Sequence, residues 1–112
     1  MTARLASDVT VSALLRRVEQ SGGFGVVLNK GDPTSGAILI VLLERGQRVQ
    51  VLERLLQPDG KYAWGAALAA DHNDEDYQRF LARRRRFDQD SWLLELDTAS
   101  AERFAAELAG FD

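Results

Sequence analysis

The chain has 112 residues, carries a formal net charge of −3 and contains no cysteine. Hydrophobic residues make up 46% of it and charged residues 28%, which is the composition of a folded globular protein. The absence of cysteine excludes a disulfide framework, a thiol nucleophile and a cysteine-ligated metal site. The net negative charge disfavours a protein that coats nucleic acids, because such proteins need an excess of cations against the phosphates.

The sequence gives no sign of export or membrane insertion. Its first eight residues lack the basic and apolar regions of a signal peptide. Its longest apolar run, Ala37–Leu43, has seven residues, whereas a membrane-spanning helix needs about 20. No linker or internal repeat divides the chain. We therefore expect one domain over residues 1–112, located in the cytoplasm and without membrane contact.

The first half of the chain predicts one helix followed by four strands. The helix is expected to start at Ser7 or Asp8 as its N-cap and to end at Gly22–Gly23. Its apolar stripe consists of Val11, Leu14, Leu15 and Val18. The alternation of apolar and polar residues places strands near residues 24–28, 37–43, 49–55 and 62–66. The connections between these strands are short, which favours an antiparallel meander.

The second half predicts a helix, a fifth strand and a last helix. Asn73 or Asp74 caps the second helix, and Thr98 caps the third. Because amphipathic helices must bury their apolar stripes, we expect an α+β fold of two layers. One layer is a mainly antiparallel sheet of about five strands, and three helices cover one face of it. The element order is α-β-β-β-β-α-β-α.

The most distinctive segment is Arg83–Trp92, in which four arginines precede a pattern of aromatic and acidic residues. Arginine binds phosphate or carboxylate groups bidentately, and aromatic rings stack on bases, so the segment is a candidate binding site. Its candidate residues are Arg83, Arg85, Arg86, Phe87, Asp88, Asp90 and Trp92. In the alternative, structural interpretation the arginines stabilise a helix C-terminus, and Trp92 is a core residue. Arg84, on the apolar face of the helix, then snorkels or pairs internally. Surface charge runs are usually just solvated, which favours the structural interpretation.

Two further segments are weaker candidates. The loop Lys30–Gly36 adds Lys30, Asp32 and Ser35 to the possible contact surface, but it lacks the order of a phosphate-binding loop. His72 is the only histidine, which excludes a site with two histidine ligands. The acidic residues around it lack the spacing of a calcium-binding loop and suit a helix cap. We therefore expect no metal and no cofactor.

Four segments of the chain share a recognisable pattern. They are Leu5–Arg17, Gly23–Val27, Gly31–Ile40 and Arg86–Leu96, the last with the order Arg-Phe-Asp-x-Asp-x-Trp. In order and length they resemble a small alphaproteobacterial family known only as a domain of unknown function, number 1491. That family usually has proline at the position of Gln89 and ends shortly after the last strand, whereas this chain continues over residues 98–112. The resemblance implies a bacterial class and a compartment, but no activity, substrate or cofactor.

Three functions remain open from the sequence. The preferred hypothesis is a non-catalytic interaction or regulatory module with a protein partner, because arginine and aromatic residues are enriched at contact hot spots. The alternative is an RNA- or nucleotide-binding module that uses Arg83–Arg86 and a stacking Trp64 or Trp92. A small hydrolase or transferase built on His72, Asp88 and Asp90 is the least favoured. A homodimer through a sheet edge or through residues 66–70 is also considered.

Overall fold

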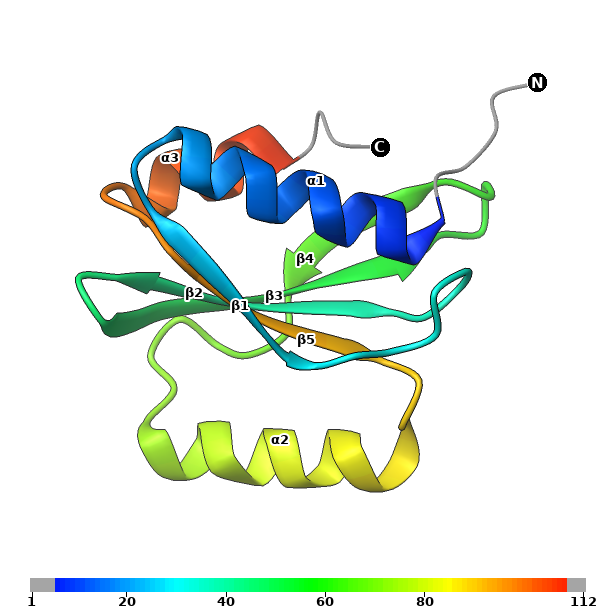
Figure 1. Ribbon diagram of the computed structural model, residues 1–112. Helices are drawn as coiled ribbons and strands as arrows, with labels where there is room; N and C mark the ends of the chain where they lie inside the picture. The colour runs from blue at the N-terminus through cyan, green and yellow to red at the C-terminus, as the bar shows by residue number, and fades with distance from the viewer. Residues whose placement is uncertain (1–5, 109–112) are drawn as a thin grey trace.

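In the computed structural model, which describes residues 6–108, a five-stranded sheet lies between helices (Figure 1). The α+β class, the three helices and the five mainly antiparallel strands agree with the prediction. The elements in chain order are α1 (Ser7–Gln20), β1 (Phe24–Asn29), β2 (Ile38–Glu44), β3 (Gln47–Leu56), β4 (Tyr62–Ala66), α2 (Asp74–Phe87), β5 (Trp92–Asp97) and α3 (Ala101–Glu107).

The strand order in the sheet is β1-β5-β2-β3-β4. β5 lies between β1 and β2, antiparallel to β1 and parallel to β2. The predicted meander is therefore correct for β2, β3 and β4 but wrong for β1, which does not pair with β2. The physical reason is burial: β2 and β5 are the strands with apolar residues on both faces, so they occupy the centre, while the exposed β1 forms an edge.

The helices lie on both faces of the sheet. Ile38, Ile40 and Leu42 of β2 pack with α1 and α3, whereas Leu39 and Val41 pack with α2. Figure 1 shows α1 and α3 above the sheet and α2 below it. The expectation of two layers with helices on one face is thus wrong, and the fold has three layers. Since β2 is apolar on both sides, each side needs its own helical cover.

The helix starts show which residues satisfy the free backbone N–H groups. Of the two predicted caps of α2, Asn73 is the one observed: its side-chain oxygen accepts from the Asp76 backbone N–H (2.8 Å). The Asn73 backbone N–H donates in return to the Asp76 carboxylate (3.2 Å), which completes a capping box. Ala6, rather than Ser7 or Asp8, is the N-cap of α1. α3 begins after Ser100, and its first free N–H, that of Ala101, donates to Glu44 at the end of β2 (2.9 Å). The predicted Thr98 cap is wrong because a carboxylate from another element takes that role.

Candidate functional site

The segment between α2 and β5 is held inside the fold. Trp92 is 4% exposed, and its indole N–H donates to the carbonyl oxygen of Asp32 (2.8 Å). The Asp88 carboxylate accepts hydrogen bonds from the Ser91 hydroxyl (2.6 Å) and from the Asp90 amide (3.2 Å). These polar groups of Asp88, Asp90 and Trp92 therefore stabilise the turn that leads from α2 into β5.

The loop after β1 packs on this same turn. The Asp32 amide donates to the Asp90 carbonyl (2.9 Å), and a Cβ atom on Gly31 or Gly36 would lie 2.3 Å from that carbonyl oxygen. The Asp32 carboxylate accepts from the Ser35 amide (2.8 Å) and the Ser35 hydroxyl (3.1 Å). These bonds, led by that from the Ser35 amide, lower the pKa of Asp32.

This loop also supplies contacts to the start of α1. The carbonyls of Pro33 and Thr34 accept from the amides of Asp8 and Ser7, and the Ser7 hydroxyl donates to the Gly36 carbonyl (2.7 Å). The structure thus brings two of the sequence candidates, the loop and the Asp88–Trp92 turn, together at one end of the sheet. Their contacts are hydrogen bonds within the domain, which hold the loop and the turn in place. The side chain of Lys30 is exposed at the same end of the sheet.

Arg84 is the arginine of the run that turns inward. It forms ion pairs with Glu53 of β3 and with Asp88 (3.8 Å), and its Nε donates to the Ser91 hydroxyl (3.4 Å). Of the two expectations for Arg84, snorkelling or internal pairing, the structure therefore shows internal pairing. It ties the end of α2 to the sheet and to the following turn.

The remaining candidates at the end of α2 face outward. Arg83, Arg85 and Arg86 are exposed, and no carboxylate within residues 6–108 pairs with any of them. Phe87 is 77% exposed, the highest value among the large hydrophobic residues in that range, and the Arg86 guanidinium lies 5.8 Å from the centroid of its ring. The structure therefore separates the candidates into residues that bond within the domain and four exposed ones, which are Arg83, Arg85, Arg86 and Phe87.

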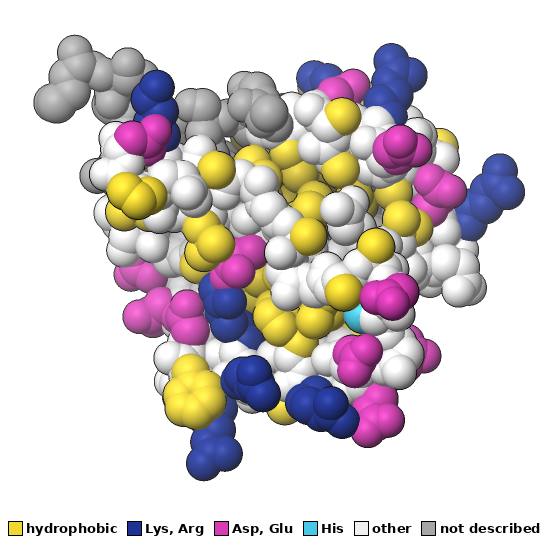
Figure 2. Space-filling view, turned by 180° about the vertical axis from the view of Figure 1, so that it is seen from behind, with side chains coloured by type: hydrophobic (Ala, Val, Ile, Leu, Met, Phe, Trp, Pro, Cys, Tyr) yellow, Lys and Arg dark blue, Asp and Glu magenta, His cyan; other side chains and the backbone are white. Residues whose placement is uncertain are grey.

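A groove of about 740 Å³ runs between α2 and the connection from β4. Figure 2 shows this side of the molecule, with basic side chains along its lower part, where α2 lies, and apolar side chains above them. The groove is lined by Ala67, Leu68, Ala69, His72, Asp76, Arg79, Phe80, Arg83, Arg84, Phe87 and Asp88. We refer to these residues as the α2 groove. It contains the apolar residues 67–69, which the sequence suggested only as part of a dimer contact.

A second cavity of about 400 Å³ lies on the other side of α2. Leu39, Leu81 and Leu93 form its apolar part, and Arg85 is one of its polar residues. Arg83 and Arg85 therefore face different hollows, although only one residue separates them in the sequence. Arg83 shares its hollow with Phe87 and Arg85 does not.

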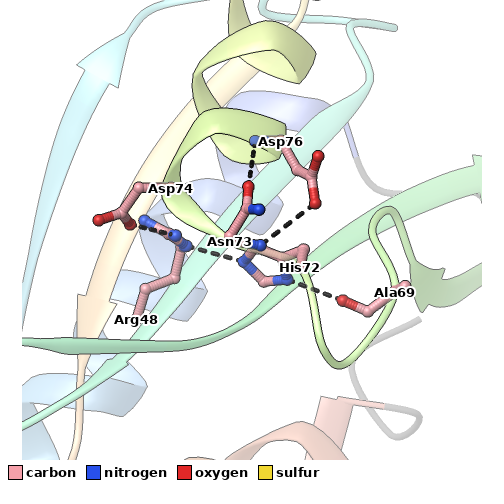
Figure 3. A network of polar contacts seen from close by, with 6 residues as sticks. All are labelled: Arg48, Ala69, His72, Asn73, Asp74 and Asp76. Atoms are coloured by element: carbon pink, nitrogen blue, oxygen red, sulfur yellow. Dashed lines mark hydrogen bonds and ion pairs between the residues drawn. The ribbon is translucent and has the colours of Figure 1, made fainter.

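His72 belongs to a polar network at the start of α2 (Figure 3). Its Nε2 accepts from the Nε–H of Arg48 (2.8 Å), and its Nδ1 lies 2.8 Å from the carbonyl of Ala69. Arg48 also pairs with Asp74 (2.6 Å) and lies over the ring of Tyr77 (4.0 Å to the centroid). Because both of its ring nitrogens are engaged in this way, His72 lacks the free base nitrogen and the orienting carboxylate that the hydrolase hypothesis requires.

Two further observations concern metal binding and membrane insertion. No three histidine or carboxylate side chains within residues 6–108 gather closely enough to hold a metal ion. In the same range, no helix combines the length and the apolar character needed to cross a membrane.

Comparison with known proteins relates the chain to one family and to solved structures. A family described as "Protein of unknown function (DUF1491)" matches residues 5–106. The solution structure of a protein from A. tumefaciens is 32% identical, covers 91% of this chain and 92% of that one, and has a TM-score of 0.75. An NMR structure of a DUF1491 family protein from Caulobacter crescentus is 28% identical, covers 92% and 94% of the two chains, and has a TM-score of 0.78. No curated protein matches.

The family match corrects one expectation about the C-terminal helix. Relatives were expected to end shortly after the last strand, but the match extends to residue 106, inside α3 (Ala101–Glu107). α3 carries buried Phe104, which packs on the α1 side of the sheet. A family domain without α3 would leave part of that face of the sheet uncovered, which explains why the helix belongs to the shared fold.

Proposed function

Because the chain belongs to the DUF1491 family, which is described only as proteins of unknown function, we propose its function from the geometry. It is a non-catalytic interaction module of the cytoplasm, and it binds a protein partner through the α2 groove. The observation that carries this proposal is Phe87, a large aromatic side chain left 77% exposed beside arginines without ion-pair partners in residues 6–108. Arginine and aromatic residues dominate the energetics of protein interfaces.

The composition of the groove supports a protein partner over RNA. A nucleic-acid site tracks a continuous phosphate backbone with cations, and it adds several aromatic platforms for bases. The α2 groove instead has the carboxylates of Asp76 and Asp88 in its wall, and Trp92 is buried. Its apolar part, formed by residues 67–69 and Phe80, offers contacts that the sugar-phosphate backbone of RNA does not use. RNA binding is therefore the second candidate, carried by Arg83, Arg85 and Arg86 alone.

Site-specific photocrosslinking in the native bacterium tests the proposal. A benzophenone amino acid placed at Phe87 is expected to form a defined adduct with another protein. The same group at Glu19, exposed on α1, is the matched control and should not form that adduct. Adding Arg83→Glu to the Phe87 variant should abolish the adduct. The same adduct from both positions would contradict the proposal, and an adduct that ribonuclease removes would replace it with RNA binding.

A further inference from the structure

We infer that the α2 groove binds a short apolar segment with a cluster of carboxylates at one end, and that the acidic end lies at Phe87. This inference rests on the proposed function and names the chemistry of its partner. Its basis is the distribution of charge in the groove, because some of these charged groups already pair with other residues of the domain.

The wall near the start of α2 has no unpaired cation among residues 6–108, because its arginine, Arg79, is shared by two carboxylates. The Arg79 guanidinium pairs with Glu75 (2.8 Å) and lies 4.0 Å from the Asp76 carboxylate. Asp76 also accepts from the backbone N–H of Asn73 (3.2 Å) in the capping box. Each of these charged groups therefore has a partner of opposite charge or a hydrogen bond within the domain.

The wall near the end of α2 differs. Asp88 is bonded to Ser91 and paired with Arg84, and Arg84 is paired with Glu53. Arg83 has no such partner in residues 6–108, and Arg86 adds a second unpaired cation next to Phe87. The free positive charge of the groove is thus confined to its Phe87 end. A carboxylate pairs with guanidinium groups through short, charge-assisted bonds, so the complementary end of a partner is acidic.

The middle of the groove has the properties of a surface that receives apolar side chains. Ala67 and Ala69 are small and leave space, while Phe80 and Leu68 supply partly exposed apolar area. From Asp76 to Phe87, helix α2 rises roughly 16 Å at 1.5 Å per residue. That length accommodates about three turns of a partner helix or about five residues of an extended segment. An amphipathic segment in such a groove is an established mode of recognition.

Peptide titrations of the 112-residue protein, followed by NMR amide shifts, test the inference. The probe is a 12-residue helical peptide with leucines on one face and three glutamates in its last turn. A matched peptide has lysines in place of these glutamates. We expect the acidic peptide to shift groove amides and to bind at least about tenfold more tightly than the basic one, a difference near 1.4 kcal/mol. A spin label at its acidic end should broaden amides near Phe87 more than those near His72.

Variants of the protein complete the test. Arg83→Glu should weaken binding of the acidic peptide by about tenfold or more and reverse the preference between the two peptides. Arg16→Glu, a charge reversal at an exposed site of α1, should leave both affinities unchanged. Equal affinity for the two peptides, or shifts outside the groove, would overturn the inference.

Different results would overturn the inference of an acidic segment and the proposed function of protein binding. An adduct from Phe87 to a partner whose contact segment lacks carboxylates would overturn the inference and keep the function. Tighter binding of an oligouridylate than of the acidic peptide, lost in Arg83→Glu, would overturn both. If the groove amides shift when the protein is concentrated without peptide, and the sedimenting mass doubles, the groove binds a second copy of this chain. That result would overturn the inference that an acidic segment binds there.

Discussion

Arg84 of α2 is ion-paired with Glu53 of β3, and this pair fixes α2 to the sheet. The Arg84 side chain is 23% exposed and that of Glu53 11%, so both charges are largely removed from water. The adjacent Arg83 has no ion pair in residues 6–108 and faces the groove. Two neighbouring residues of the same type therefore have opposite roles, one in the fold and one at the proposed contact surface.

Removing Arg84 should destabilise the domain, because Glu53 would stay in the interface without its counter-charge. We expect Arg84→Ala to lower the free energy of unfolding by about 3 kcal/mol. Arg83→Ala, the matched control, should change it by less than about 0.5 kcal/mol. Urea unfolding followed by tryptophan fluorescence measures both. Equal losses in the two variants would refute the assignment of separate roles.

The bond from Trp92 to Asp32 joins positions 60 residues apart in the sequence. Trp92→Phe keeps an aromatic ring but leaves the Asp32 carbonyl without this donor, so we expect a loss of about 1–2 kcal/mol in unfolding free energy. The buried indole N–H of Trp64 has no hydrogen-bond acceptor in the described part of the chain. Trp64→Phe should therefore be close to neutral. A larger loss of unfolding free energy for Trp64→Phe than for Trp92→Phe would contradict a stabilising role of the Trp92–Asp32 bond.

The Asp32 loop makes stability depend on pH in the acid range. Its bonds, first from the Ser35 amide, lower the pKa of Asp32 below the ordinary 3.8. A depressed folded-state pKa stabilises the fold above the unfolded value, and that contribution is lost as the pH falls through the folded value. Asp32→Asn should thus be less stable than wild type at neutral pH, with the gap closing below about pH 4. Thermal unfolding of both proteins across this pH range measures the gap.

The Ser35→Ala variant separates this effect from a general loss of the loop. It removes only the hydroxyl donor, so the pKa of Asp32 should rise part of the way toward 3.8. A carboxyl-carbon NMR titration of Asp32 measures the change. An Asp32 pKa at its ordinary value in the wild-type protein would show that these bonds do not form in solution.

The contacts of His72 predict one neutral tautomer. Its Nε2 accepts from Arg48, so the ring proton must be on Nδ1, where it donates to the Ala69 carbonyl. Nitrogen NMR at a pH where the ring is neutral should show a protonated Nδ1 and a bare Nε2. Arg48→Ala, which removes the donor to Nε2, should shift the balance toward the other tautomer. A protonated Nε2 in the wild-type protein would contradict the network of Figure 3.

The sheet-edge dimer considered from the sequence stays a prediction, and β1 is the edge that favours it. Phe24, Val26, Val27 and Leu28 are 61%, 46%, 38% and 46% exposed, and no charge or proline interrupts this strand. Unprotected edges of this kind pair with other strands. If β1 mediates a dimer, Val26→Lys should yield a monomer in analytical ultracentrifugation with unchanged circular dichroism. Ala63→Lys on the opposite edge, β4, should keep the dimer. A wild-type monomer at high concentration would disprove it.

Spacing along the chain is enough to place the helices and strands and to assign the residues that act within one of them. The stripe of Val11, Leu14 and Val18 is buried in α1, because a period of 3.6 residues is a local property of the chain. The same helical spacing placed Arg84 with Tyr77 and Phe80, on the face of α2 that turns to the sheet. The capping of α2 by Asn73 was equally local, since the donor and acceptor lie three residues apart.

Which elements pack against one another could not be read from spacing. The insertion of β5 between β1 and β2, the placement of α2 opposite α1, and the pair of Arg84 with Glu53 join segments that are distant in the chain. Periodicity shows that a strand is apolar on both faces, but not which strands or helices cover it. The same limit applied to the site: identical arginines differ in role because one faces a carboxylate of β3 and its neighbour faces the groove.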